Sequence, residues 1–361
     1  MEFLRFLESI RTGIGDFFFA TVTHLGEEVF FLAIAILFYW CISKRQGYYI
    51  LLTGVIGSVI NQWLKILCRI PRPWILDPTF EPVGDAVAEA TGYSFPSGHT
   101  QNIAGTFGCI GRYNKQRWVK ITSVVIILLV AFSRMYLGVH TPLDVTVSLG
   151  IAAALVFAFH FIFRTEESTN KYMLYVVIGS VIFSIAFIIY VSLLSESGFT
   201  TDADLANLYS AKKNAATLAG CLVGLGLVYP LDRFVIKFDT KGRWYSQVIK
   251  FVVGVAIVLG IKSGLKAPLE ALTHLFTDGS CVHVCACGAG HLVEGECEFQ
   301  CVCGAGYVAR AIRYFLIVAF AGGVWPLTFK FFEKLRIGKL ESFTEWVLSK
   351  FTKEKTVGKR K

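Results

Sequence analysis

The sequence contains little charge. Charged residues make up 17% of its 361 residues, and hydrophobic residues make up 54%. An average soluble domain carries about 25% charged and about 45–50% apolar residues, so this composition excludes an ordinary water-soluble fold. Several apolar runs also reach the roughly 18 to 20 residues that cross a hydrocarbon core about 30 Å thick. We therefore expect an integral membrane protein.

A compact basic domain is also missing, although the formal net charge is +9. The lysines and arginines lie largely in short connections between apolar runs and in a tail. This distribution argues against a nucleic-acid partner and is typical of membrane proteins. We expect membrane lipids as partners, and the sequence specifies no protein partner.

The first 25 residues lack the pattern of a cleavable signal peptide, which has a basic start and one uninterrupted apolar stretch. Charged residues interrupt their apolar positions instead, namely Glu2, Arg5, Glu8, Arg11 and Asp16. The pattern predicts that residues 1–25 form an amphipathic helix at the membrane interface.

The lengths of the apolar runs predict an all-α fold, a polytopic helical membrane protein with about nine transmembrane helices. The first six spans form a catalytic transmembrane core at residues 26–194, and the last three belong to a C-terminal group at residues 195–329. The expected spans are residues 26–43, 48–68, 97–114, 118–137, 142–163, 172–194, 214–231, 246–264 and 308–329.

Basic residues mark one side of this predicted bundle. Cytoplasmic connections of membrane proteins carry an excess of lysine and arginine. The connections 69–96, 138–141, 195–213 and 265–307 are therefore expected on the outer, periplasmic or lumenal side. The segments expected in the cytoplasm contain Lys44 and Arg45, Arg112 to Lys120, Arg164 and Lys171, Arg233 to Arg243, and the tail at residues 330–361.

The tail combines many lysines with apolar residues such as Phe343 and Trp346. One interpretation is a basic amphipathic helix on the anionic inner leaflet. The other is a solvated basic terminus, and the sequence does not decide between them.

Three short motifs lie at the ends of predicted spans. Lys65 closes the second span and is followed by Arg72-Pro73 in the pattern Lys-x6-Arg-Pro. Pro96-Ser97-Gly98-His99 opens the third span, where backbone amides of a helix N-terminus favour an anion. Ser133-Arg134 closes the fourth span in the pattern Ser-Arg-x5-His-x3-Asp, which continues to His140 and Asp144.

All three motifs are expected at the outer membrane face, so they are able to form one site. Phosphoryl transfer places negative charge on three equatorial oxygens, and Lys65, Arg72 and Arg134 supply cations to bind them. His140, oriented by Asp144, suits the nucleophile, and His99 suits the acid that protonates the leaving oxygen. Each motif alone has ordinary structural explanations, such as a snorkelling cation or a helix cap. Their joint occurrence at neighbouring span ends favours the catalytic interpretation.

At these residues the sequence resembles the type 2 phosphatidic acid phosphatase superfamily, and no motif position departs from its three-part signature. The resemblance covers about residues 26–165. It implies a phosphatidic-acid-phosphatase-like helical core and phosphatase activity that needs no metal and no cofactor. It also implies His140 as nucleophile, His99 as acid, and a set of phosphate ligands consisting of Lys65, Arg72, Ser97, Gly98 and Arg134.

The expected function is therefore hydrolysis of a lipid phosphate or a polyprenyl pyrophosphate on the non-cytoplasmic face, through a phosphohistidine intermediate. Trp74 and Phe95 are candidates for the wall of the site. Three alternatives remain open: a phosphatase for a soluble sugar phosphate, like glucose-6-phosphatase; a lipid phosphotransferase; and a transporter or receptor without catalysis. The intact His99, His140 and Asp144 disfavour the last. A bacterial plasma membrane is the expected location.

A repeated cysteine pattern occupies the last outer connection, within residues 278–307. A unit this short needs covalent or metal crosslinks to stay folded. On the outer side disulfides are favoured, while His283 and His291 keep a zinc site as the alternative. The cysteines are Cys281, Cys285, Cys287, Cys297, Cys301 and Cys303.

Overall fold

Most long helices of this protein begin directly after a serine or threonine. In the computed structural model, each of these side chains accepts a hydrogen bond from a backbone amide of the first helical turn, which has no partner within the helix. Ser43, Ser97, Thr141, Thr165 and Thr201 begin α4 (Lys44–Cys68), α6 (Gly98–Tyr113), α8 (Pro142–Phe163), α9 (Glu166–Leu193) and α10 (Asp202–Leu231).

The structure describes residues 1–87, 90–275, 283–285, 299–301, 304–338 and 340–342. Its other α-helices are α1 (Glu2–Ser9), α2 (Gly13–Thr23), α3 (Glu28–Leu37), α5 (Pro73–Leu76), α7 (Arg117–Tyr136), α11 (Trp244–Gly264), α12 (Lys266–His274), α13 (Gly304–Ala319) and α14 (Phe329–Lys334). Shorter 3-10 or π turns are η1 (His24–Gly26), η2 (Phe38–Ile42), η3 (Gly84–Val87), η4 (Glu196–Gly198), η5 (Asp232–Ile236), η6 (Phe320–Val324) and η7 (Trp325–Thr328).

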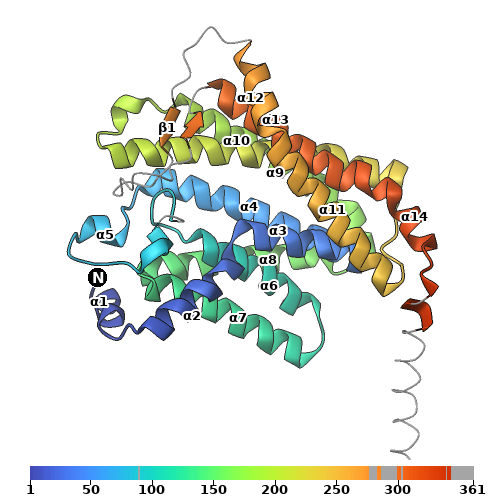
Figure 1. Cartoon of the computed structure of the whole chain (residues 1–361), viewed down its shortest axis with the longest axis horizontal. Helices are drawn as coiled ribbons and strands as arrows, with labels where there is room; N and C mark the ends of the chain where they lie inside the picture. Colours follow the sequence, from blue (N-terminus) through green and yellow to red (C-terminus); the bar gives the residue numbers. More distant parts are fainter. Residues whose placement is uncertain (88–89, 276–282, 286–298, 302–303, 339, 343–361) are drawn as a thin grey trace, which may run out of the picture.

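Helix α4 lies at the centre of the bundle. It contacts α6 and α8 on one side and α9 and α10 on the other (Figure 1). In the most apolar stretch of the segment Lys44–Leu76, 56% of the residues are buried, against 11% in the corresponding stretch of Trp244–Thr273. Helix α11 is therefore peripheral, and the apolar side chains that it exposes are suited to lipid contact.

The predicted all-α membrane fold is confirmed, and the described residues contain seven helices that are long and apolar enough to cross a membrane. A bent helix pair, Gly13–Gly26 with Glu28–Ile42, brings this number to eight when it is counted as one span. The segment predicted as the span 97–114 forms α6, which has only 16 residues. At 1.5 Å per residue it is about 24 Å long, shorter than the hydrocarbon core. The count of nine is therefore approximate.

The chain bends by 51° between α2 and α3, at η1. Gly26 ends η1 and packs against α6, where a Cβ atom on Gly26 would lie 2.9 Å from Cβ of His99. Thr23, one turn earlier, accepts a 2.6 Å hydrogen bond from Nη1 of Arg134. The N-terminal segment thus contacts two motif residues, His99 and Arg134, directly. Its own sequence gives no indication of these contacts.

The cysteine-rich segment contributes two short antiparallel strands, β1 (His283–Cys285) and β2 (Phe299–Cys301), with His283 opposite Cys301. The choice between disulfides and zinc depends on side chains that lie outside the described residues. Most of the basic tail also lies outside them. The remaining cysteines, Cys41, Cys68, Cys109 and Cys221, are free thiols.

Candidate active site

The structure brings the three sequence motifs together at one end of the helices. Lys65 lies in the last turn of α4, Arg134 in the last turn of α7, and His140 in the connection that leads into α8. They border one cavity of ≈190 Å³. Its lining includes six of the predicted site residues, Lys65, Arg72, Gly98, His99, Arg134 and His140.

His140 is held between a cation and a carboxylate. Its Nε2 lies 3.1 Å from Nη1 of Arg72, and its Nδ1 lies 3.5 Å from Oδ2 of Asp144. Because a guanidinium only donates hydrogen bonds, Nε2 must present its lone pair, and the ring proton belongs on Nδ1. Burial lowers the pKa of His140, and the nearby charges of Arg72, Arg134 and Lys65 lower it further. The ring is therefore neutral at pH 7, as a nucleophile requires.

Asp144 lies in the first turn of α8 and is 1% exposed. Its Oδ2 accepts hydrogen bonds from Oγ of Ser94 at 2.6 Å and from the backbone amide of Thr141 at 2.8 Å. The Thr141 side chain accepts in return from the amide of Asp144, which completes a capping box. One carboxylate thus caps the helix and faces the His140 ring.

Ser94 is a residue that motif reasoning missed, since it stands two positions before the Pro-Ser-Gly-His motif. It is fully buried. A second link joins the same segments, because Oγ of Ser148 donates 2.9 Å to the carbonyl of Ser97. The starts of α6 and α8 are therefore fixed relative to one another, and with them His99 and His140.

Backbone carbonyls position two of the cations. Arg72 donates from Nε to Gly92 O at 3.1 Å, from Nη2 to Thr91 O at 2.9 Å, and from Nη1 to Val139 O at 2.9 Å. Nζ of Lys65 donates to the carbonyl of Tyr93. The loop at residues 91–93 thus orients both cations toward the cavity, which reduces the reorganisation needed when an anion binds.

The start of α6 adds backbone donors to this cationic pocket. Ser97 caps the helix, and a Cβ atom on Gly98 would meet nothing nearer than Oδ1 of Asn61 at 4.0 Å. The bare backbone of Gly98 leaves an anion room to approach the helix N-terminus. His99 follows on the cavity wall, and its buried Nε2 has no hydrogen-bond partner in the described part of the chain.

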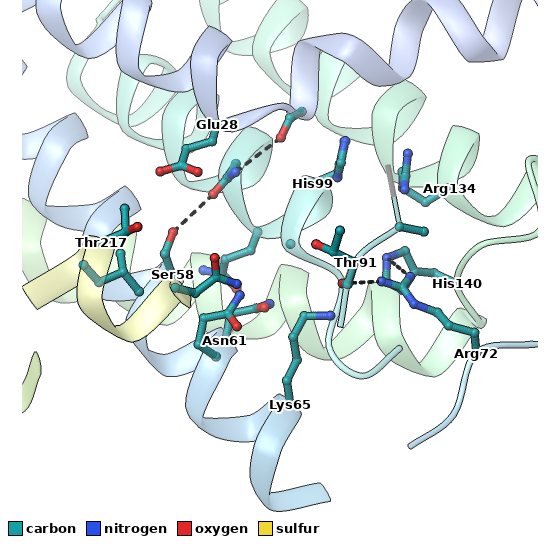
Figure 2. A pocket seen from close by; sticks show the side chains of 18 residues that line it. Glu28, Ser58, Asn61, Lys65, Arg72, Thr91, His99, Arg134, His140 and Thr217 are labelled. Carbon is teal, nitrogen blue, oxygen red and sulfur yellow. Dashed lines mark hydrogen bonds between the residues drawn. The ribbon is translucent and has the colours of Figure 1, made fainter. Parts of the chain in front are cut away.

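The cavity extends beyond these residues into a polar region that the sequence analysis did not predict. Figure 2 shows Glu28, Ser58 and Thr217 at the end of the cavity opposite Arg72 and His140. The residues come from α3, α4 and α10. The predicted wall residues Trp74 and Phe95 are not among the residues that line the cavity.

A second group of cations lies at the other ends of the same helices. Three of the predicted cytoplasmic connections meet around one pocket there, which is lined by Arg45, Arg112, Lys115, Lys120 and Arg164. One further basic connection, which begins at Arg233, joins this end through the ion pair of Lys44 with Asp232 and the hydrogen bond from Arg233 to the carbonyl of Asn170. The basic connections and the histidine site thus occupy opposite ends of the bundle.

Fold and site together define a class: a polytopic helical membrane protein with a buried cation and histidine site that is suited to an anion. Comparison with known families is more specific. Residues 45–168 match the PAP2 superfamily, and residues 216–289 match the PAP2 superfamily phosphatase transmembrane extension. The chain belongs to the PAP2 superfamily, which is the family that the three motifs indicated.

The individual relatives are phosphatases, and their names refer to different lipids. Undecaprenyl-diphosphatase BcrC of Bacillus subtilis is 33% identical over 118 residues, which are 32% of this chain and 58% of that protein. Phosphatidylglycerophosphatase B of the same organism is 28% identical over 163 residues, 42% of this chain and 72% of that protein. Sphingosine-1-phosphate phosphatase 1 of Mus musculus is 23% identical over 266 residues, 69% of this chain and 59% of that protein. For four such relatives the match spans only 39 to 59% of their length.

Proposed function

We propose that this protein is a membrane phosphatase that hydrolyses the phosphate of a lipid, or a polyprenyl pyrophosphate, through a phosphohistidine intermediate. The observation that carries the proposal is the placement of His140. Its Nε2 faces the cationic cavity beside Arg72, while its Nδ1 faces Asp144. The relatives that bear phosphatase names support the same reaction class.

In this mechanism the substrate phosphate binds among Lys65, Arg72 and Arg134 and against the amides at the start of α6. Nε2 of His140 attacks phosphorus, and the bond from phosphorus to the leaving oxygen breaks. His99 donates a proton to that oxygen, so the alcohol leaves neutral. Asp144 stabilises the positive charge that the His140 ring gains.

The second half of the reaction reverses these roles. His99, now neutral, takes a proton from a water molecule as that water attacks phosphorus. The bond from phosphorus to Nε2 breaks, inorganic phosphate leaves, and both histidines return to their starting states. The proposal needs no metal, because the three cations and the helix amides supply the charge that stabilises the transferring group.

We place this site on the non-cytoplasmic side of the membrane. The support is the separation of charge along the bundle. The basic connections meet at one end, around Arg45, Arg112 and Arg164, and the histidine site lies at the other. Since basic connections stay in the cytoplasm, the site then faces the periplasm, the cell exterior or a lumen.

The test is phosphate release by the detergent-purified protein in EDTA, from a lipid monophosphate, a polyprenyl pyrophosphate and glucose 6-phosphate. We expect EDTA-resistant release that His140→Ala reduces by at least about 10³-fold. His160→Ala, which changes a histidine of the basic pocket, serves as the matched control and keeps its activity. Equal release by wild type and His140→Ala contradicts the proposal.

The same assay separates hydrolysis from transfer. Both reactions share the phosphohistidine and differ in the acceptor that reaches it. In a hydrolase, an added alcohol acceptor leaves phosphate release unchanged. In a transferase, phosphate release falls and a phosphorylated alcohol forms instead.

A further inference from the structure

The cavity has two chemically different halves. Around His140 and His99 its charged groups are cations, contributed by Lys65, Arg72 and Arg134. The other end, which we call the head-group half, has neutral polar side chains and one carboxylate. It includes Glu28, Ser58, Gln101, Asn102 and Thr217, and Asn61 borders it beside the start of α6.

Two amides in the head-group half carry unused hydrogen-bonding atoms. Asn61 is 1% exposed; its Nδ2 donates to the carbonyl of Pro96 at 3.3 Å, while Oδ1 has no partner in the described ranges. Gln101 is also 1% exposed, and neither Nε2 nor Oε1 has a partner among the residues that the structure describes. Buried amides are costly when unpartnered, so within the described part of the chain these atoms indicate a ligand with hydrogen-bonding groups of its own.

The backbone makes room for one of these amides. Gly57 on α4 faces Gln101 on α6, and a Cβ atom at residue 57 would lie 2.7 Å from Nε2 of Gln101. Asn102 next to it is anchored, since its Nδ2 donates to Gly26 O at 3.3 Å and its Oδ1 accepts from Ser58 at 3.5 Å. Hydrogen bonds and helix packing thus fix the positions of polar side chains in the head-group half.

The charge in this half selects against a second phosphate. Glu28 is the only charged side chain among the described residues that line it. Lys213, Lys262 and Arg310 act on Glu28 electrostatically, but they do not line the cavity. A carboxylate beside neutral amides accepts hydrogen bonds from hydroxyl or ammonium groups and repels a phosphate.

The reaction geometry directs the leaving group into this half. Attack by His140 is in line, so the leaving oxygen lies on the side of phosphorus away from His140. Figure 2 shows His99, the proposed acid, between the pair Arg72 and His140 and the group Glu28, Ser58 and Thr217. The part of the substrate attached to the leaving oxygen therefore extends past His99 toward Asn61 and Gln101.

We propose that the head-group half binds a hydroxyl- or amine-bearing head group, with Gln101 and Glu28 as specificity-determining residues. The inference rests on the proposed function and narrows it: the substrate is a phosphomonoester of a hydroxylated head group, and phosphates or pyrophosphates on a plain hydrocarbon chain are poor substrates. Asn61 contributes through Oδ1.

The test compares short-chain substrates that remain below their micellar concentration: octyl phosphate, 2-hydroxyoctyl phosphate, 2-amino-3-hydroxyoctyl phosphate and octyl diphosphate. We expect kcat/KM to be at least about tenfold higher for the hydroxylated monoesters than for octyl phosphate, as unpaired site groups reject an analogue that lacks the hydroxyl. Octyl diphosphate ranks last. Equal values for the monoesters, or a preference for the diphosphate, overturn the inference.

Variants assign this preference to the residues. Gln101→Met and Glu28→Gln are expected to lower kcat/KM for the hydroxylated monoesters toward that of octyl phosphate, by a larger factor than they lower it for octyl phosphate itself. Gln46→Met is the matched control, because Gln46 is a buried α4 residue outside the cavity. Its Nε2 also has no partner in the part of the chain that the structure describes. A preference that survives both cavity variants overturns the assignment.

Two further measurements complete the test. One distinguishes a soluble substrate from a lipid, and the other tests the head-group half even if the protein hydrolyses none of the compounds. Glycerol 3-phosphate and glucose 6-phosphate carry hydroxyls without a chain; turnover comparable to 2-hydroxyoctyl phosphate identifies a soluble substrate, and slow turnover identifies a lipid. If no compound is hydrolysed, the proposed function fails. Calorimetric binding of 2-hydroxyoctyl phosphate and octyl phosphate to wild type and Gln101→Met then still tests the head-group half, since equal affinities overturn it.

Discussion

Oγ of Ser94 donates a 2.6 Å hydrogen bond to Oδ2 of Asp144, the carboxylate that faces Nδ1 of His140. Ser94 is fully buried and lies just outside the recognised motif. The hydrogen bond fixes the carboxylate on the side of the ring opposite the substrate. Without it, the amide of Thr141 is the remaining hydrogen-bond donor to that oxygen among the described residues, and the carboxylate is held less firmly.

We expect Ser94→Ala to lower kcat about 10- to 100-fold with a small change in KM. Residues that hydrogen-bond to the partner of a functional histidine, as Ser94 does to Asp144, typically have effects of this size. The measurement is steady-state kinetics on a soluble phosphomonoester. Ser180→Ala on α9 is the control, because another buried hydroxyl there donates to the carbonyl of Val176. A loss confined to KM contradicts the orienting role.

The two functions of Asp144, helix cap and histidine partner, are separable. Asp144→Asn keeps an oxygen for the amide of Thr141 but loses the charge that stabilises the His140 cation, so we expect a loss of about 10²- to 10⁴-fold in the rate of phosphohistidine formation. Rapid quench with radiolabelled substrate measures it. Unchanged formation would remove Asp144 from the mechanism.

Thr141→Ala makes the complementary change. It removes the cap side chain and leaves the carboxylate, so it is expected to cost about 1 kcal/mol of stability. Its rate of phosphohistidine formation should stay within a few-fold of wild type. Thermal unfolding in detergent, followed beside the quench experiment, separates the two effects.

Arg72 is expected to resist conservative replacement. Its fork donates to Thr91 O and Gly92 O as well as toward Nε2 of His140, and a lysine ammonium cannot match that planar arrangement. Arg72→Lys should lower kcat/KM about 10²- to 10³-fold. Arg69→Lys is the control, since Arg69 contacts the backbone of Gly198 outside the cavity. Near-normal activity of Arg72→Lys contradicts a role for the fork.

The lowered pKa of His140 predicts how stability depends on pH. The unfolded ring titrates near about 6.5, and the folded ring titrates lower, because burial and the three cations disfavour its charged form. Below about pH 6.5 the unfolded state therefore binds more protons, and stability falls as pH falls, by up to about 1.4 kcal/mol per pH unit. Wild type should lose Tm more steeply than His140→Asn between about pH 6.5 and 5. Parallel Tm curves for the two proteins contradict a neutral buried ring.

Close helix packing outside the site gives a stability prediction. A Cβ atom on Gly220 of α10 would lie 2.2 Å from the carbonyl oxygen of Ala311 on α13, whereas Gly150 on α8 has nothing within 4 Å. Gly220→Ala should therefore destabilise the protein by about 1–3 kcal/mol through overpacking. Gly150→Ala should be neutral or slightly stabilising in the same thermal assay. Equal Tm values for both variants would contradict this packing.

Much of the site was predictable because its residues stand at positions with local signals. Lys65 and Arg134 are charges at the ends of apolar runs, and Thr141-Pro142 marks a helix start beside Asp144. Glu28, Asn61 and Gln101 carry no such signal. A polar residue inside an apolar run has many structural explanations, and its contribution to a cavity depends on how α3, α4, α6 and α10 pack.

The span count was harder to predict for a related reason. Helix α6 contains many small or polar residues that face α4, α7 and α8, so it needs less length and less apolar surface than a helix in contact with lipid. The bend at η1 was not predictable either; Gly26 at this bend packs against His99 of α6, a residue far away in the sequence.

The cavity is built by more of the chain than the family match at residues 45–168. All the proposed catalytic and phosphate-binding residues fall within that stretch, whereas Glu28, Asn214 and Thr217, which also line the cavity, lie beyond its limits. The head-group half is therefore divided: Ser58, Asn61, Gln101 and Asn102 lie within the matched stretch, and Glu28 and Thr217 lie outside it. Chimeras that exchange α3 and α10 between relatives are therefore expected to keep one protein's chemistry and to acquire part of the other's substrate preference.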